Sequence, residues 1–193
     1  QALYERHKVL TYPRTSSRYL SSDLAPQIPS RLAALKTLSP YGEWVTAIGT
    51  PQFSKRIVDD TKVTDHHAII PTENPVKFSA LSQDEATIMD MVLKRFIAAF
   101  LPDCEKDTTE ILTDIGEDRF RSAGVVIASA GWRQVYLKDQ DEEDEKETLL
   151  PQVTEGDAIQ ISDVQLQTKK TKAPALHNEA SILAAMEDRK STR

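Results

Sequence analysis

Cysteine is almost absent from this chain, and long apolar runs are absent altogether. The 193 residues include one cysteine, Cys104, which excludes an internal disulfide and a cysteine-rich zinc site. No apolar run approaches the roughly 20 residues of a membrane-spanning helix. The first residues show no signal-peptide pattern, and no Gly-x-x-x-x-Gly-Lys loop for nucleotide phosphates occurs. We therefore expect a cytoplasmic protein that neither enters a membrane nor uses ATP.

Charge is distributed unevenly along the chain. The net charge is −6 and the pI about 5.3, which is unusual for a nucleic-acid binder. However, eight basic and three acidic residues give residues 1–58 a net charge of +5, whereas nine acidic residues and one lysine give residues 139–157 a net charge of −8. Because phosphate contacts depend on the local field, the overall acidity does not exclude phosphate binding by the first part of the chain.

The first hundred residues are predicted to be mainly helical. Residues 1–9 resemble the end of a helix, and a short amphipathic helix is expected from Pro29 until Pro40 stops it. A longer helix is expected over residues 82–101, because it opens with the Ser-x-x-Glu pattern of a capping box. Its apolar stripe is predicted from residues at helical spacing, widened by three further residues: Ile88, Met91, Val92, Arg95, Phe96 and Ala99, with Met89, Ile97 and Phe100.

Strand patterns follow Pro102. Residues 109–115 and 120–128 are two β-rich segments on either side of a glycine turn, and residues 131–137 are expected to add a strand. Residues 158–166 alternate almost strictly between apolar and polar side chains, which is typical of a strand with one buried face. The acidic residues 139–147 are expected to form a solvated loop.

The most informative motif is LTYPRTSS, residues 10–17. The phenol of Tyr12 stands two residues before the guanidinium of Arg14. A protonated tyrosine, with an ordinary pKa of about 10, is a poor nucleophile, so its attack on a phosphodiester needs a nearby cation or base. Arg14 offers a cation whose planar fork suits phosphate oxygens, and Pro13 favours an extended backbone at Tyr12. On spacing alone, a buried tyrosine and a surface arginine in an ordinary turn is the simpler interpretation.

Further motifs support the chemical interpretation. Tyr12-Pro13-Arg14-Thr15 resembles the active-site motif of type IA DNA topoisomerases, and the flanks QALYE and SRYLS resemble the topoisomerase III branch. Residues 62–72, KVTDHHAIIPT, resemble the second fingerprint of the same family. The matches follow the order of the family. Ser16 departs from the pattern, since many relatives carry aspartate there.

This resemblance implies an α+β segment of a toroidal enzyme. Residues 1–102 would form most of the helical domain that carries the catalytic tyrosine, and residues 103–170 would form a β-rich part of the arch. Residues 171–193 would form a basic linker and the start of a further helical DNA-binding domain, with Asn178 in place of the usual threonine.

The resemblance also implies a reaction. Tyr12 would attack single-stranded DNA to give a 5′-phosphotyrosyl link and a free 3′ hydroxyl, another strand would pass, and the hydroxyl would attack back. The outcome would be relaxation of negative supercoils or decatenation, without ATP because one phosphoester replaces another. The expected catalytic residues are Tyr12 and Arg14. The expected DNA-binding residues are Arg14, Thr15, Ser17, Arg18 and His66.

His66 has two candidate roles, and the residues around it are not expected to bind a metal ion. In the family the first histidine of its stretch lies near the scissile phosphate, so His66 would donate to phosphate or carry a proton; a structural histidine explains it equally well. Asp59, Asp60, Asp65 and His67 are not expected to complete a metal site with it, because adjacent histidines project apart and too few ligands remain. The Mg²⁺ of the family would be bound by an upstream domain outside this segment, which alone is expected to be inactive.

Two interpretations remain open. In the first, the chain is part of a strand-passing enzyme whose partners include single-stranded DNA and a helicase or single-strand-binding protein, in the cytoplasm with the nucleoid. In the second, it is a non-catalytic scaffold that binds single-stranded DNA or docks a partner. Replacing Tyr12 by phenylalanine abolishes chemistry in the first case and changes nothing in the second.

Overall fold

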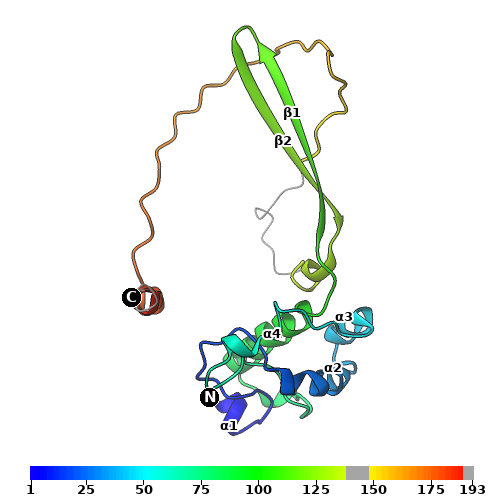
Figure 1. Ribbon diagram of the computed structural model, residues 1–193, viewed down its shortest axis with the longest axis vertical. Coiled ribbons are helices and arrows are strands. Elements are labelled where there is room, and N and C mark those ends of the chain that lie inside the picture. Colours follow the sequence, from blue (N-terminus) through cyan, green and yellow to red (C-terminus); the bar gives the residue numbers. More distant parts are fainter. Residues whose placement is uncertain (138–147, 189–193) are drawn as a thin grey trace. The chain divides into compact units, whose positions relative to one another are not determined.

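Helices and one antiparallel hairpin make up the regular structure of this chain in the computed structural model, which describes residues 1–137 and 148–188 (Figure 1). The predicted acidic loop, residues 139–147, lies outside these residues. The chain divides into two units, Gln1–Pro151 and Gln152–Arg193. The mixture of helices and sheet confirms the α+β class, whereas the arch and the toroidal architecture stay predictions.

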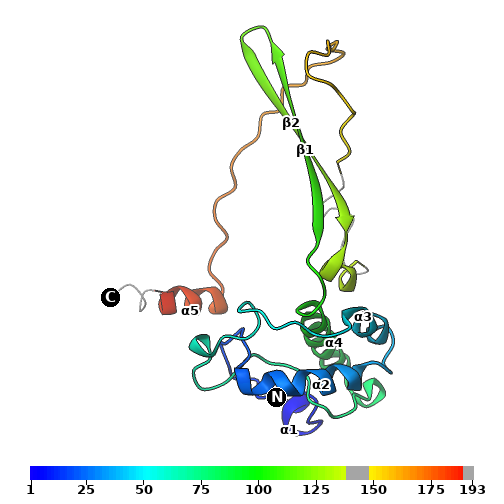
Figure 2. The same cartoon turned by 45° about the vertical axis from the view of Figure 1, so that its right-hand side comes forward.

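The helices of the first unit share one apolar core. They are α1 (Ala2–Glu5), α2 (Ile28–Leu35), α3 (Tyr41–Ile48) and α4 (Gln83–Ala98), with short 3-10 helices at Ser22–Gln27, Asp60–Lys62 and Phe78–Ala80. Helix α3 packs against both α2 and α4 (Figure 2). Helix α1 also packs against α4. The largest fully buried side chains are Ile28, Leu35, Pro71, Met89, Leu93, Ile97 and Val135.

The early helices differ in length from their predictions. Helix α1 ends at Glu5, well before residue 9, and Lys8 then takes a left-handed φ of 55° that no α-helix continues. Helix α2 is confirmed and ends at Leu35, before Pro40 is reached. Helix α3 was not predicted from the sequence.

The start of helix α4 confirms the capping box. Glu85 N–H donates to Ser82 Oγ (3.3 Å), and Ser82 N–H donates to Glu85 Oε2 (2.9 Å). The second bond is the main reason that the pKa of Glu85 lies below its ordinary value; Arg6 and His7 lower it further. Because Arg6 Nη2 also donates to Glu85 Oε1 (2.5 Å), the same carboxylate fastens the end of α1 to the start of α4.

The buried face of helix α4 agrees with the prediction only in part: Met89, Phe96 and Ile97 are buried as expected, but Leu93 was not predicted. Ile88 and Met91 are 51% and 63% exposed, whereas Met89 and Leu93 are fully buried. The sequence of this helix carries two overlapping apolar stripes, and spacing does not distinguish them. The core formed with α3 and the 3-10 helix that follows the hairpin selects the stripe of Met89, Leu93, Phe96 and Ile97.

The predicted hairpin is confirmed. Strands β1 (Glu105–Ile115) and β2 (Asp118–Ser129) pair antiparallel, with Ile115 opposite Asp118. Gly116 in the turn has a φ of 63°, which glycine adopts without steric cost. Paired charges on the hairpin include Arg119 Nε donating to Asp114 Oδ1 at 2.6 Å.

The predicted strand at residues 131–137 is wrong. A 3-10 helix, Gly131–Val135, occupies this segment and places Val135 in the core against α4. Trp132 N–H donates to Pro102 O at 2.8 Å. A Cβ at position 131 would lie 2.3 Å from Asp103 O, so only glycine allows the two backbones to approach this closely and turn the chain into the helix.

The predicted strand at residues 158–166 is also wrong. Every residue of this range is exposed and outside regular structure. Alternation describes side chains, but a strand also needs a neighbouring strand for its backbone hydrogen bonds, and the described part of the second unit contains none. Its regular element is helix α5 (Glu179–Asp188). Across the described residues, no helix is long and apolar enough to cross a membrane.

Two substitutions in α4 test which stripe is buried. We expect Leu93→Ala to lower the free energy of unfolding by about 2–5 kcal/mol, because it leaves a cavity in the core. Met91→Ala, the control on the exposed stripe, is expected to change it by less than about 0.5 kcal/mol. Urea unfolding followed by circular dichroism measures both; equal losses would contradict the assigned face.

Candidate active site

The two sequence motifs lie side by side in the first unit. Leu10 and Pro71 form an antiparallel bridge. Thr11 N–H donates to Ile70 O (2.9 Å), and Ile70 N–H donates back to Thr11 Oγ1 (3.0 Å). Thr72 N–H donates to Val9 O (3.0 Å). A short backbone ladder therefore joins the segment before Tyr12 to the segment after His66.

Two hydroxyls extend this connection beyond Tyr12. Thr15 Oγ1 donates to His66 O (3.1 Å), and Ser17 Oγ donates to Lys62 O (3.1 Å). Ala68 N–H donates to Tyr19 O (2.8 Å). The hydroxyls of Thr15 and Ser17, predicted to bind DNA, thus hold the backbone of the second motif; their contact with DNA stays a prediction.

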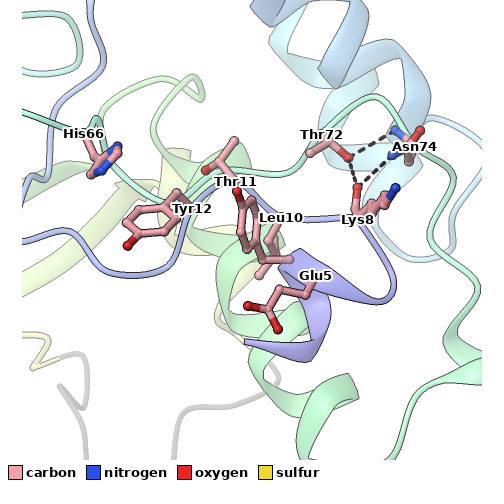
Figure 3. Close-up of a pocket in the computed structure, with 9 residues that line it drawn as sticks. Glu5, Lys8, Leu10, Thr11, Tyr12, His66, Thr72 and Asn74 are labelled. Carbon is pink, nitrogen blue, oxygen red and sulfur yellow. Dashed lines mark hydrogen bonds between the residues drawn. The ribbon is translucent and has the colours of Figure 1, made fainter.

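Tyr12 and His66 are in direct contact. Their ring centroids are 4.3 Å apart with the planes tilted by 42°, and Figure 3 shows the two rings together. Tyr12 is half-buried and His66 is exposed, so a ligand can reach both. His67 differs from its neighbour, since it is half-buried and its Nδ1 lies 2.7 Å from Ala68 O.

An open pocket of about 980 Å³ begins at this pair. Tyr4 approaches Tyr12 edge to face, with centroids 5.6 Å apart. The lining residues are Tyr4, Glu5, Lys8, Leu10, Thr11, Tyr12, His66, Thr72 and Asn74. Tyr4, Lys8 and Asn74 were not singled out in the sequence, and helical spacing gives no signal for them because α1 ends at Glu5 and Lys8 has a left-handed φ.

The predicted phosphate ligands Arg14 and Arg18 lie at the surface. Both are exposed, and the described residues offer neither of them a hydrogen bond or ion pair. Arg14 does not line the pocket of Tyr12. The structure therefore brings Tyr12 and His66 together and leaves both guanidinium groups available to a ligand at the surface.

Lys62 contacts Tyr19, which lies two residues after the tyrosine motif (residues 10–17). Lys62 Nζ lies 4.4 Å above the centre of the Tyr19 ring and donates to Tyr19 Oη (3.1 Å). This bond is the main cause that raises the pKa of Lys62. Asp59 lies 3.6 Å from the same amine and accepts a hydrogen bond from Thr61 Oγ1 (2.6 Å), which is the main cause that lowers the Asp59 pKa. Tyr19 is thereby fixed within the protein.

The described residues contain no group of three or more histidine, cysteine, aspartate or glutamate side chains that would hold a metal ion. Asp59, which the sequence places near His66, is instead bonded to Thr61 and Lys62. The location of the family's Mg²⁺ in an upstream domain stays a prediction.

The ladder makes Thr11 a testable position. Thr11→Val removes the acceptor of the Ile70 N–H, and Ile70 is buried, so we expect a loss of about 1–3 kcal/mol in the free energy of unfolding. Thr11→Ser keeps the oxygen and is expected to retain most of the stability. Thr46→Val on α3, whose exposed hydroxyl bonds within one helix, is the control, and urea unfolding is the measurement. A loss no larger than that of the control would contradict the role of the ladder.

Comparisons with known proteins identify the family. A family model described as DNA topoisomerase matches residues 1–192. DNA topoisomerase 3 of one strain of Bacillus cereus is 46% identical over 195 residues, which cover 97% of this chain and 26% of that protein. DNA topoisomerase 3 of Bacillus licheniformis and of Bacillus subtilis are each 40% identical, with the same coverage. The chain spans about a quarter of the length of these relatives. The similarity to DNA topoisomerase 3 confirms the branch predicted from the motifs. The chain belongs to the DNA topoisomerase family.

Proposed function

We propose that this chain is the nucleophile-bearing part of a type IA topoisomerase that cleaves and rejoins single-stranded DNA through Tyr12. The observation that carries the proposal is the contact between Tyr12 and His66 at the edge of an open pocket. Two motifs separated by some fifty residues are joined by backbone bonds in a way that presents these two rings to a ligand. The relatives named DNA topoisomerase 3 support the same conclusion.

The proposed first step is a transesterification. Tyr12 Oη forms a bond to a backbone phosphorus, the bond from phosphorus to the 3′ oxygen breaks, and the phenol proton is given up while the 3′ oxygen gains one. His66, in contact with the Tyr12 ring, is the group we assign to phosphate contact or proton transfer, since imidazole exchanges protons at neutral pH. The second step is the reverse attack by the 3′ hydroxyl, and neither step consumes ATP.

Phosphate contacts in this proposal come from the exposed cations. Arg14 and Arg18 follow the nucleophile in sequence and make no ion pair with the described residues. Arg14 would favour the phenolate and the charge that develops on the phosphoryl oxygens. Thr15 and Ser17 would contribute to DNA binding by holding the second motif in place. Contacts of Arg14 and Arg18 with phosphates would position a strand without reading its sequence.

The remaining assignments concern the whole enzyme. We propose that it relaxes negative supercoils or decatenates DNA, with Mg²⁺ held by an upstream domain and supplying charge stabilisation near the phosphate. Single-stranded DNA is the substrate, a helicase or single-strand-binding protein a partner, and the nucleoid in the cytoplasm the location.

A covalent trapping experiment tests the proposed chemistry. Full-length enzyme is mixed with Mg²⁺ and a 3′-labelled single-stranded oligonucleotide and then denatured, and the labelled peptide is mapped by mass spectrometry. We expect a nucleotide adduct on Tyr12, because a 5′-phosphotyrosyl link keeps the 3′ fragment attached to the protein. The adduct should be absent from Tyr12→Phe, which keeps the ring but has no nucleophile.

The same experiment also tests the competing function, a non-catalytic scaffold. Oligonucleotide binding is measured in parallel by fluorescence anisotropy, and Tyr12→Phe is expected to bind as the unmodified enzyme does. Tight binding without an adduct on any residue would overturn the enzymatic proposal and favour a single-strand-binding scaffold. An adduct on another residue would contradict the assignment of Tyr12.

A further inference from the structure

The end of the pocket opposite Tyr12 is built around Lys8. Its φ of 55° is the only left-handed value at a non-glycine residue among the described residues, in a region that such side chains seldom adopt. Its carbonyl oxygen accepts bonds from Thr72 Oγ1 (2.7 Å) and Asn74 Nδ2 (2.8 Å). Figure 3 shows both bonds at the side of the pocket away from Tyr12 and His66. Two side chains of the second motif and its continuation therefore hold Lys8 in an unusual conformation beside the pocket.

The charge of Lys8 is available to a ligand. Its side chain is exposed, and within the described residues no hydrogen bond or ion pair engages the amine. Glu5 is the one acidic residue that lines the pocket, and its carboxylate accepts a bond from Gln1 Nε2 (2.8 Å). In Figure 3 the carboxylate of Glu5 and the amine of Lys8 lie well apart. Lys8 therefore presents an uncompensated positive charge at its end of the pocket.

Tyr4 of α1 supplies an exposed aromatic surface next to Tyr12. Its side chain is 39% exposed and meets Tyr12 edge to face, so it lines the pocket in contact with the nucleophile. Tyr4 and Lys8 line the same pocket. An exposed ring and an unpaired cation in one groove are the combination by which proteins bind single strands: bases stack on the ring and the cation contacts the backbone.

We propose that Tyr4 and Lys8 form a subsite for the nucleotide adjacent to the scissile phosphate. The base of that nucleotide stacks on Tyr4, and its phosphate contacts the Lys8 amine. The pocket volume of about 980 Å³ is large enough for one nucleotide. This inference rests on the proposed function and extends it, since it assigns strand binding to the residues before the tyrosine motif. Because every base has a stacking face, the subsite tolerates any sequence.

Binding measured without chemistry tests the subsite. Full-length enzyme carrying Tyr12→Phe is titrated with a fluorescent single-stranded oligonucleotide at several salt concentrations. We expect Tyr4→Ala and Tyr4→Leu to raise the Kd at least about fivefold, from the loss of one stacked base, and Tyr4→Phe to leave it unchanged. Lys8→Gln should reduce the slope of log K against log salt by about 0.7, the value for one phosphate contact, and Lys8→Arg should restore it.

The controls separate binding from structural effects. Lys36→Gln removes an exposed charge outside the pocket and is expected to leave the salt slope unchanged. A rise in Kd with Tyr4→Ala, accompanied by a lower melting temperature and absent from the better packed Tyr4→Leu, would assign Tyr4 a structural role and overturn the stacking. Unchanged Kd and salt slope in the Tyr4 and Lys8 variants would overturn the subsite, while a Tyr12 adduct in the unmodified enzyme would leave the proposed function standing.

Discussion

The pairing of the chain around Thr11 with the chain around Ile70 is the interaction on which the site depends. Its reciprocal bonds, Thr11 N–H to Ile70 O and Ile70 N–H to Thr11 Oγ1, join segments that are 59 residues apart. Closing so long a loop has an entropic cost, which the buried side chains next to the ladder offset, among them Leu10 and Ile70. The ladder brings the backbone segments that carry Tyr12 and His66 together, and the two rings are in contact.

The polar side chains of the tyrosine motif and of Arg18 after it have two different roles. Thr15 and Ser17 donate to backbone carbonyls of the second motif, so their hydroxyls maintain geometry. Arg14 and Arg18 remain exposed without a partner in the described part of the chain, and this leaves their charge to a ligand. The polar residues of this run therefore differ in function: the two hydroxyls stabilise the structure, and the two arginines are exposed cations. The net charge of +5 over residues 1–58 gives this surface a field that favours phosphate.

Local signals predicted the local features well. The pair of Ser82 and Glu85 predicted the start of α4, and the β-rich segments around Gly116 predicted the hairpin. The motifs predicted the pair Tyr12 and His66 only through the family resemblance. Features that depend on distant contacts were missed: α1 stops short of Lys8, whose conformation is held by partners 64 and 66 residues away, and residues 131–135 form a helix because Gly131 packs against Asp103. Periodicity contains no information about such contacts, and the subsite of Tyr4 and Lys8 was missed for the same reason.

Hydrogen–deuterium exchange of the full-length enzyme tests the central claim, that the two motifs form one cooperative unit. Peptides that cover residues 8–20 and 62–72 are followed by mass spectrometry at increasing urea concentrations below global unfolding. The ladder predicts that the amides of Thr11, Ile70 and Thr72 are protected and lose their protection together in a single step. Free exchange of residues 62–72 while residues 8–20 stay protected would show that the second motif does not hold the first, and would contradict the account.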